Sequence, residues 1–368
     1  HWHGLRQLNS NQMDGVNGVT QCPTSQGETL QYKFKATQYG HSWYHSHYSS
    51  QYSDGVAAPM LIHGPHSDTW DEELPPMIVT DWIHKSAFAE FTKEINGAGK
   101  VPQMDTILVD GRGKYNGQGS LYQQTFEAGK KYLIRIINGS TNLHFHFSLD
   151  NHIMKVVSMD FVPIRPYTTN SLSVGIGQRY GVIIEAKPTT NSNNGKYWMR
   201  TEYVTTGFCN SEITGIPSAN LTLQQTGIFS YSDAGSGEPT TSRFPATVGC
   251  SDEKPSNLVP VVPWTVTVPQ NDINGNTYEA GLDLTNTNKW HGAVNRWSIT
   301  DTPMWLDMSN PTILNLANTS WTPEYDVVKY DYDAKKGFVY LVISSGKITK
   351  STNPISKLSS PHPIHLHG

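Results

Sequence analysis

Short apolar runs, each about the length of a β-strand, set the pattern of hydrophobic and polar positions along the chain. They are rich in Val, Ile, Tyr and Phe and are separated by Asn, Asp, Gly and Pro, which is typical of strands joined by turns. The runs cover residues 27–38, 130–140, 154–164, 171–186 and 195–204. Only residues 84–95, HKSAFAEFTKEI, have helical spacing, and we expect them to form a surface insertion. The pattern therefore predicts an all-β protein of sandwiches or barrels.

The chain is too long for one ordinary core, since it has 368 residues. A polar, acidic and Pro-terminated stretch follows residue 62, and a Gly/Ser/Pro/Thr-rich stretch lies before residue 263. We therefore predict a first unit over residues 1–68, a second over 69–235, a linker over 236–262 and a last unit over 263–368.

Charge and apolar length exclude two classes of protein. The net charge is −4 with 16% charged residues and no basic run, so the chain lacks the positive surface that nucleic-acid binding requires. No apolar run approaches the length that spans a bilayer. We expect neither nucleic acid nor a membrane as a partner.

Three cysteines and three Asn-X-Ser/Thr sequons indicate a secreted, glycosylated protein. The sequons start at Asn138, Asn220 and Asn318. Cys209 and Cys250 bracket the end of the second unit, and we expect a disulfide between them. Cys22 is then left without a partner.

Fifteen histidines are distributed unevenly, and seven of them fall in three short stretches. Because side chains alternate along a strand, the two histidines of HWH, of HSH and of HLH each point to one face. These pairs are His1 and His3, His45 and His47, and His365 and His367. They can therefore converge on one place. His362 precedes His365 by three residues, so it points the other way and is expected to serve a second site.

Converging neutral imidazoles indicate a metal centre. They suit Cu, Zn, Fe or Ni, and six are too many for one tetrahedral zinc ion, so more than one ion is implied. Aromatic neighbours favour copper, although residue type alone leaves zinc open.

The same stretches resemble the first three of the four copper signatures of the multicopper oxidases, and specifically of ascomycete-type fungal laccases. The resemblance covers residues 1–23, 40–55 and 362–368, and it extends through residues 150–186 and 295–314 to nearly the whole chain. It implies three cupredoxin-like Greek-key β-sandwich domains, of which the first and last are truncated here.

The resemblance also implies roles for the histidines in a protein that carries four copper ions. The type 2 ion takes His1 and His365, the type 3 pair takes His3, His45, His47 and His367, and the type 1 ion takes His362. The fourth signature, a His-Cys-His motif, is absent, and no Cys of this chain has a flanking His. We therefore expect a partial chain that is inactive alone, with strands before His1 and with the partner of Cys22 outside it.

The activity implied by the resemblance is one-electron oxidation of phenols coupled to four-electron reduction of O2 to water, in a secreted monomer. Asp14 matches a family carboxylate that serves proton delivery, and an ordinary Asp-Gly turn is the alternative reading. Asn170 stands just before SLSVGIGQRY, where laccases often carry an acidic residue that orients phenols.

Two alternatives stay open. The chain can belong to another multicopper oxidase, a ferroxidase or an ascorbate oxidase, which would share every copper ligand. The truncated chain alone can also be an inactive copper-binding β-sandwich. The remaining histidines are not predicted as ligands; they are His41, His63, His66, His84, His144, His146, His152 and His291.

Overall fold

The computed structural model describes most of the chain. The described residues are 1–95, 102, 104–188, 194–203, 224–245, 248–266, 302–327 and 362–368, with the backbone of strands 277–281, 283–287, 294–298 and 340–344. Cys209, Asn220 and His291 lie outside them.

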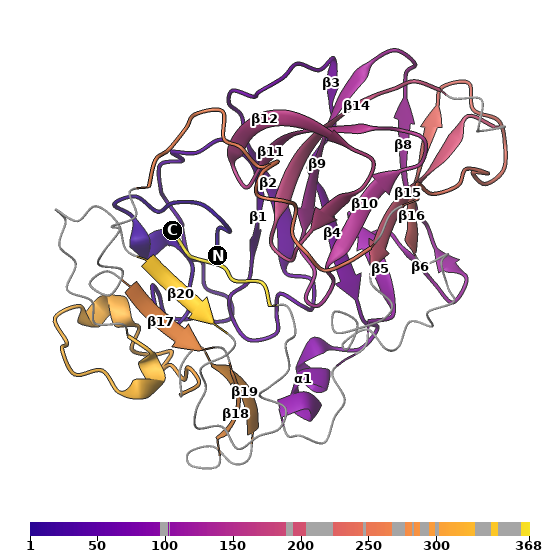
Figure 1. Cartoon of the computed structure of the whole chain (residues 1–368). Coiled ribbons are helices and arrows are strands. Elements are labelled where there is room, and N and C mark those ends of the chain that lie inside the picture. The colour runs from indigo at the N-terminus through magenta and orange to yellow at the C-terminus, as the bar shows by residue number, and fades with distance from the viewer. Residues whose placement is uncertain are drawn as a thin grey trace.

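Two sheets stacked face to face form the middle sandwich, at the upper right of Figure 1. One sheet has the order β12 (Val162–Thr169), β11 (Met154–Met159), β14 (Arg179–Glu185), β9 (Lys131–Asn138), β4 (Met77–Trp82) and β5 (Thr106–Val109), with β3 (Glu72–Glu73) beside β9. The other has the order β13 (Leu172–Val174), β10 (Phe145–Leu149), β15 (Lys196–Tyr203), β16 (Gln225–Tyr231) and β8 (Tyr122–Phe126). A small hairpin, β6 (Lys114–Tyr115) and β7 (Gln118–Gly119), extends from β5.

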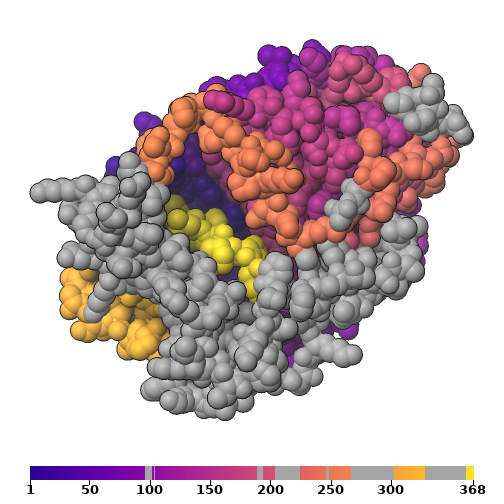
Figure 2. Space-filling view, viewed as in Figure 1, coloured from indigo at the N-terminus to yellow at the C-terminus, as the bar shows by residue number. Residues whose placement is uncertain are grey.

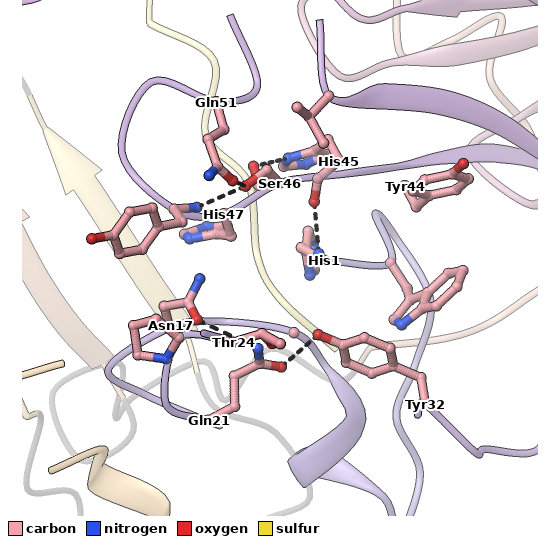
Figure 3. A pocket seen from close by; sticks show the side chains of 15 residues that line it. His1, Asn17, Gln21, Thr24, Tyr32, Tyr44, His45, Ser46, His47 and Gln51 are labelled. Atoms are coloured by element: carbon pink, nitrogen blue, oxygen red, sulfur yellow. Dashed lines mark hydrogen bonds between the residues drawn. The ribbon is translucent and has the colours of Figure 1, made fainter. Parts of the chain in front are cut away.

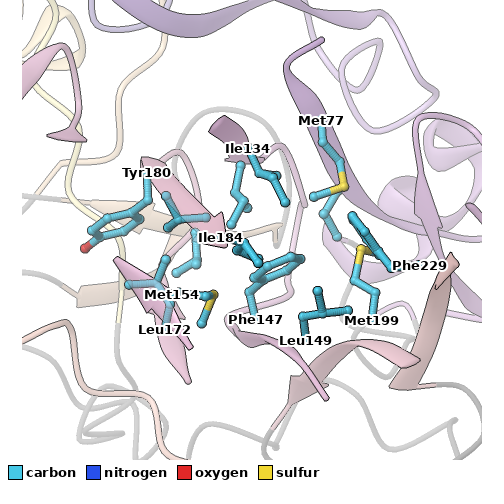
Figure 4. Close-up of a cluster of buried hydrophobic side chains, with 14 of the residues drawn as sticks. Met77, Ile134, Phe147, Leu149, Met154, Leu172, Tyr180, Ile184, Met199 and Phe229 are labelled. Atoms are coloured by element: carbon cyan, nitrogen blue, oxygen red, sulfur yellow. The ribbon is translucent and has the colours of Figure 1, made fainter. Parts of the chain in front are cut away.

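The core of the middle sandwich is formed by inward-facing residues of both sheets (Figure 4). Ile134 and Ile184 come from the first sheet, and Phe147, Met199 and Phe229 come from the second. All of them are fully or almost fully buried. This interdigitation of two alternating patterns confirms the predicted all-β class.

The first sheet is also covered on its outer face. Along β9 the residues that point away from the core include Ile137, which is fully buried against Trp43 and Ile78. Trp43 belongs to β1 (Gly40–His45), which pairs antiparallel with β2 (Ala57–Ile62). The N-terminal segment, residues 1–62, is thus packed on the middle sandwich through this hairpin.

Four of the five predicted strand regions contain strands, and residues 27–38 do not. The alternation there is real, since the half-buried rings of Tyr32 and Phe34 face Trp2 at 5.6 and 5.3 Å between ring centroids. No neighbouring segment among the described residues supplies the backbone hydrogen bonds of a β-ladder, so residues 27–38 do not form a strand.

The predicted surface helix is confirmed as α1 (Ala87–Ile95), none of whose residues is buried. It begins where Asp54 accepts hydrogen bonds from the backbone N of Ala87 (2.6 Å) and the Oγ of Ser86 (3.0 Å). Short 3-10 turns lie at η1 (Asn11–Met13), η4 (Thr312–Asn315) and η5 (Pro323–Tyr325). No helix of the described part of the chain is long and apolar enough to cross a membrane.

The last part of the chain contributes two strand pairs and an extended end. β17 (Thr277–Gly281) runs parallel to β20 (Tyr340–Ser344), and β18 (Asp283–Thr287) is antiparallel to β19 (Val294–Ser298). Residues 362–368 return to the N-terminal segment, so the two ends of the chain lie side by side in Figure 1. In Figure 2 these last residues, in yellow, lie in a hollow beside the indigo N-terminal segment.

The predicted glycosylation of Asn138 is wrong. Its side chain is fully buried, and its amide Nδ2 donates to the carbonyl oxygens of Leu143 (2.8 Å) and Val174 (2.9 Å). A glycan on that nitrogen has no space and would break both bonds. Asn318 is exposed, and its glycosylation stays a prediction.

Candidate metal centre

The backbone of the first three residues runs antiparallel to β1. Trp2 bridges to Tyr44, the backbone N of His3 donates to the carbonyl of Trp43 (3.0 Å), and that of His45 donates to the carbonyl of His1 (3.0 Å). This register places His1 directly opposite His45. Two of the predicted histidine pairs therefore meet through ordinary strand pairing.

The C-terminal segment completes the cluster. The ring of His367 lies 4.0 Å from that of His1, and the ring of His365 stacks on His3 at 3.9 Å, both between centroids. His47 lies 5.8 Å from His1 and 5.2 Å from His367. The structure thus brings together all six histidines of the three predicted pairs, from segments that are far apart in sequence.

The nitrogen spacing fits bound metal ions. The Nε2 atoms of His1 and His365 are 3.1 Å apart, and Nδ1 of His3 is 3.3 Å from Nε2 of His45. Two nitrogens that bind one ion at roughly 2.0–2.1 Å stand roughly 3.3 Å apart at a tetrahedral angle. Among the described residues, two groups have ligand atoms close enough to share an ion: His1, His365 and His367, and His1, His3 and His45.

Asp14 orients two of these rings. It is 3% exposed, its Oδ2 accepts from Nδ1 of His367 (2.9 Å), and its Oδ1 lies 3.2 Å from Nδ1 of His1. Burial raises the pKa of this carboxyl, but the hydrogen bonds to His1 and His367 outweigh it and hold the pKa well below the usual range. An ionised carboxylate behind Nδ1 leaves Nε2 of each ring free to bind a metal ion.

The rings of His3 and His45 are held in the neutral form that metal binding requires. Burial is the main cause, and it lowers the pKa of His45 to about 3 and that of His3 still further below the usual range. Nδ1 of His45 donates to the carbonyl of Ser46 (3.0 Å), so its Nε2 carries the lone pair. The donor set therefore fits a site for more than one metal ion.

Trp43 forms the inner wall of the cluster. Its indole lies 4.9 Å from the ring of His3 and 4.2 Å from that of His45, and its other contacts are Ile78 and Ile137 of the middle sandwich. The same side chain therefore anchors β1 to the sandwich and supports two of the rings.

A pocket of about 420 Å³ opens beside His1, His45 and His47 (Figure 3). On the side opposite these rings, Tyr32 donates from its hydroxyl to Oε1 of Gln21 (2.7 Å). A space of this size admits small molecules to the edge of the cluster.

The other predicted site residues are placed as follows. His362 is half-buried, and its separate role stays a prediction, as does that of half-buried Asn170 between β12 and β13. Cys22 is an exposed free thiol, and Cys250 is disulfide-bonded. Because Cys209 lies outside the described residues, the pairing with Cys250 stays a prediction.

Five of the histidines not predicted as ligands are hydrogen-bonded to other groups, and two of these are His84 and His152. His144 Nε2 lies 2.7 Å from the Oγ of Ser173, and Nε2 of His146 lies 2.9 Å from the carbonyl of Gly249. The fifth, His41, is buried with its Nε2 3.4 Å from the carbonyl of Ile136.

Two residues at the cluster were assigned no role by the sequence. The backbone of Gly177 touches the ring of His3, and the buried guanidinium of Arg179 lies against Gly4. The signal was the GIGQR turn, in which two glycines flank a single apolar residue just before a charged strand residue. The pattern predicts a turn but not what the turn touches.

Comparisons with known proteins agree with this geometry. Two family models, both described as multicopper oxidase, match residues 1–67 and 74–233. A laccase of Arthroderma benhamiae is 41% identical over the whole chain, which covers 58% of that protein, and dihydrogeodin oxidase of Aspergillus terreus is 37% identical with 62% covered. A laccase crystal structure from Botrytis aclada gives a TM-score of 0.76 at 36% identity, covering 89% of this chain and 58% of that one. The chain thus spans about three fifths of the length of these curated relatives.

Proposed function

The chain belongs to the multicopper oxidase family, and from this premise we propose that it is part of a laccase. Its fold is the all-β, cupredoxin-like architecture of that family. The complete protein would take single electrons from phenols and reduce O2 to two molecules of water. The observation that carries the proposal is the cluster of six histidines, with nitrogens at metal-sharing distances.

Copper would supply the one-electron chemistry at this site, with His1 and His365 as type 2 ligands, His3, His45, His47 and His367 as type 3 ligands and His362 as a type 1 ligand. Four ions, one of type 1, one of type 2 and two of type 3, would make up the complete set. The chain itself provides neutral imidazoles, a dry wall at Trp43 and a pocket through which O2 and water can reach the edge of the cluster.

Asp14 is proposed to move protons to that edge. Its carboxylate touches Nδ1 of both His1 and His367, so it lies one residue away from the place where O2 would be reduced. A carboxylate in this position can accept a proton and pass it on.

The test is turnover of the complete protein that contains this chain. We expect O2 consumption with a simple phenol that exceeds the rates with ferrous iron and with ascorbate. Faster turnover of ferrous iron or ascorbate would assign the protein to a ferroxidase or an ascorbate oxidase. This chain expressed alone is expected to show neither the blue colour of a copper–thiolate bond nor turnover, because none of its three cysteines has a flanking His. Blue colour and turnover from the chain alone would contradict that proposal.

One similarity favours a second candidate. Dihydrogeodin oxidase is 37% identical over the whole chain, so the protein can instead act on dihydrogeodin or a related compound. A rate with dihydrogeodin well above that with simple phenols would select this candidate.

The pH profile of phenol oxidation tests the role of Asn170. If its amide stands where related enzymes have a phenol-orienting carboxylate, the Asn170→Asp variant should shift the pH–rate profile for phenols, because a carboxylate can accept the phenolic proton. The profile for a non-phenolic electron donor, which releases no proton, should stay unchanged. Identical phenol profiles for the two proteins would remove Asn170 from the substrate site.

The remaining features of the proposal concern the environment of the protein. We propose a secreted monomer with a disulfide between Cys209 and Cys250, glycans on Asn220 and Asn318, and a partner for Cys22 elsewhere in the complete protein. Intact mass before and after reduction and deglycosylation tests each of these modifications.

A further inference from the structure

We propose that the turn formed by residues 175–179 of the middle sandwich positions the imidazole of His3 for metal binding, with Gly177 and Arg179 as the positioning residues. The inference rests on the proposed function, since it takes His3 as a metal ligand.

The contact between Gly177 and His3 is direct. Gly177 has a φ of +80°, and a Cβ built on it would lie 3.0 Å from both Cε1 and Nε2 of His3. The other ring nitrogen, Nδ1, which is bonded to Cε1, faces Nε2 of His45 at 3.3 Å. The ring of His3 is therefore held between the metal side and the bare backbone of this turn, where only glycine fits.

Backbone hydrogen bonds fix the turn on β9. The N of Gly177 donates to the carbonyl of Asn138 (2.9 Å), and the N of Asn138 donates to the carbonyl of Gln178 (3.0 Å). The N of Gly175 donates to Oε1 of Gln178 (2.8 Å). Asn138 is itself locked by its buried amide, so the turn has little freedom to retreat from His3.

Arg179 braces the same contact from behind. Its side chain is 5% exposed, and Nη1 donates to the carbonyl of Gly177 (3.0 Å) and to Oδ1 of Asp160 (2.9 Å). Its Nη2 fills the space beside Gly4, where a Cβ would collide with it. Gly4 directly follows His3, so one guanidinium contacts both the turn and the backbone next to the ligand.

The hairpin that holds Arg179 is strained. Asp160 and Phe161 connect β11 to β12 with φ values of 46° and 68°, in the left-handed region that a phenylalanine rarely adopts. This conformation lets Asp160 pair with the guanidinium and places the Phe161 ring 5.2 Å from its Cζ. Nε of Arg179 is buried with no hydrogen-bond partner among the described residues. The ion pair and the ring contact hold the guanidinium in place, and a group that positions a metal ligand has to be held in this way.

His3 belongs to the N-terminal segment and the turn belongs to the middle sandwich. The orientation of this ligand therefore depends on the contact between the two, in addition to the stacking of its ring on Trp43. Groups that orient a metal ligand from outside the coordination sphere typically change metal affinity by roughly 10- to 100-fold when they are replaced.

The test compares Gly177→Ala with Gly129→Ala in the complete protein. Both glycines have a positive φ, +80° and +89°, but a Cβ on Gly129 would meet nothing within 4 Å. The backbone penalty is thus matched, and only the contact with His3 differs. We expect Gly177→Ala to lower copper affinity by roughly 10- to 100-fold and to leave less copper per protein after dialysis against a chelator. Electron paramagnetic resonance should then show a signal from uncoupled copper, because His3 is proposed as a ligand of the type 3 copper pair.

Gly129→Ala should keep the full copper content and an unchanged resonance spectrum, with a similar loss of thermal stability. A second pair of variants tests the role of Arg179. Arg179→Met should lose copper in the same way as Gly177→Ala. Arg179→Lys, which keeps the charge beside Asp160, should retain more copper than Arg179→Met. If Gly177→Ala and Arg179→Met hold copper as tightly as the unsubstituted protein, the turn has no positioning role. If the unsubstituted protein binds no copper, the proposed function fails as well.

Discussion

The His1→Ala variant of the complete protein is expected to lose copper and to consume O2 at least about a hundredfold more slowly than the unsubstituted protein. His1 is the hub of the cluster, because its ring contacts those of His3, His45, His47, His365 and His367. It is also the residue shared by both groups that can hold an ion. Removing it takes away the one histidine common to both groups and leaves the Asp14 carboxylate without the neighbouring Nδ1 of His1.

The matched control is His84→Ala. The His84 side chain is 42% exposed, and its ring stacks on Tyr115, in the middle sandwich. This variant loses an imidazole without touching the cluster, so its copper content and turnover should match those of the unsubstituted protein. Metal analysis and an oxygen electrode give both readouts, and full copper and turnover in His1→Ala would remove the cluster from the chemistry.

The Asp150→Asn variant is expected to lower the free energy of unfolding by about 3–5 kcal/mol. Asp150 is fully buried, and its two oxygens accept from Nε (2.7 Å) and Nη2 (2.8 Å) of Arg200, with a further bond from the hydroxyl of Thr241 (2.8 Å). The neutral amide keeps the shape but leaves the buried guanidinium without a counter-charge. That uncompensated charge is the source of the large effect.

Urea denaturation, followed through the transition of the middle sandwich, measures this loss. The control is Glu185→Gln, because Glu185 pairs with Lys187 at side chains that are 44% and 72% exposed. Water screens that pair, so its loss should cost less than about 1 kcal/mol. Equal losses in the two variants would mean that the Asp150–Arg200 pair is not a buried charge pair.

The histidine pairs were predictable from the sequence because the spacing within each pair is a local pattern. A period of two places His1 and His3 on one face, and the pairing of their segment with β1 brings His45 opposite His1. The strands with strong β-branched content were predictable for the same reason, since burial on one or both faces requires apolar residues at the positions that are buried.

The failures come from contacts that the pattern does not encode. Residues 27–38 alternate as a strand does, but a strand also needs a partner chain. The sequon at Asn138 comes directly after the apolar residues of β9. The side-chain amide of Asn138 is hydrogen-bonded inside the sandwich and does not reach solvent. The fit of Gly177 against His3 depends on how two distant parts of the chain pack together, and no local period in the sequence records it.

The distance along the chain between the first and last histidines of the cluster determines how much time passes between their syntheses on the ribosome. His1 and His365 are 364 residues apart, and at roughly 5–20 residues per second the second appears roughly 20–70 s after the first. The N-terminal histidines and β1, which lie within the first 45 residues of this sequence, can therefore pair while the ribosome is still making the rest of the chain. Copper that arrives during this interval meets four of the six histidines of the cluster, so complete loading must follow synthesis of the last segment.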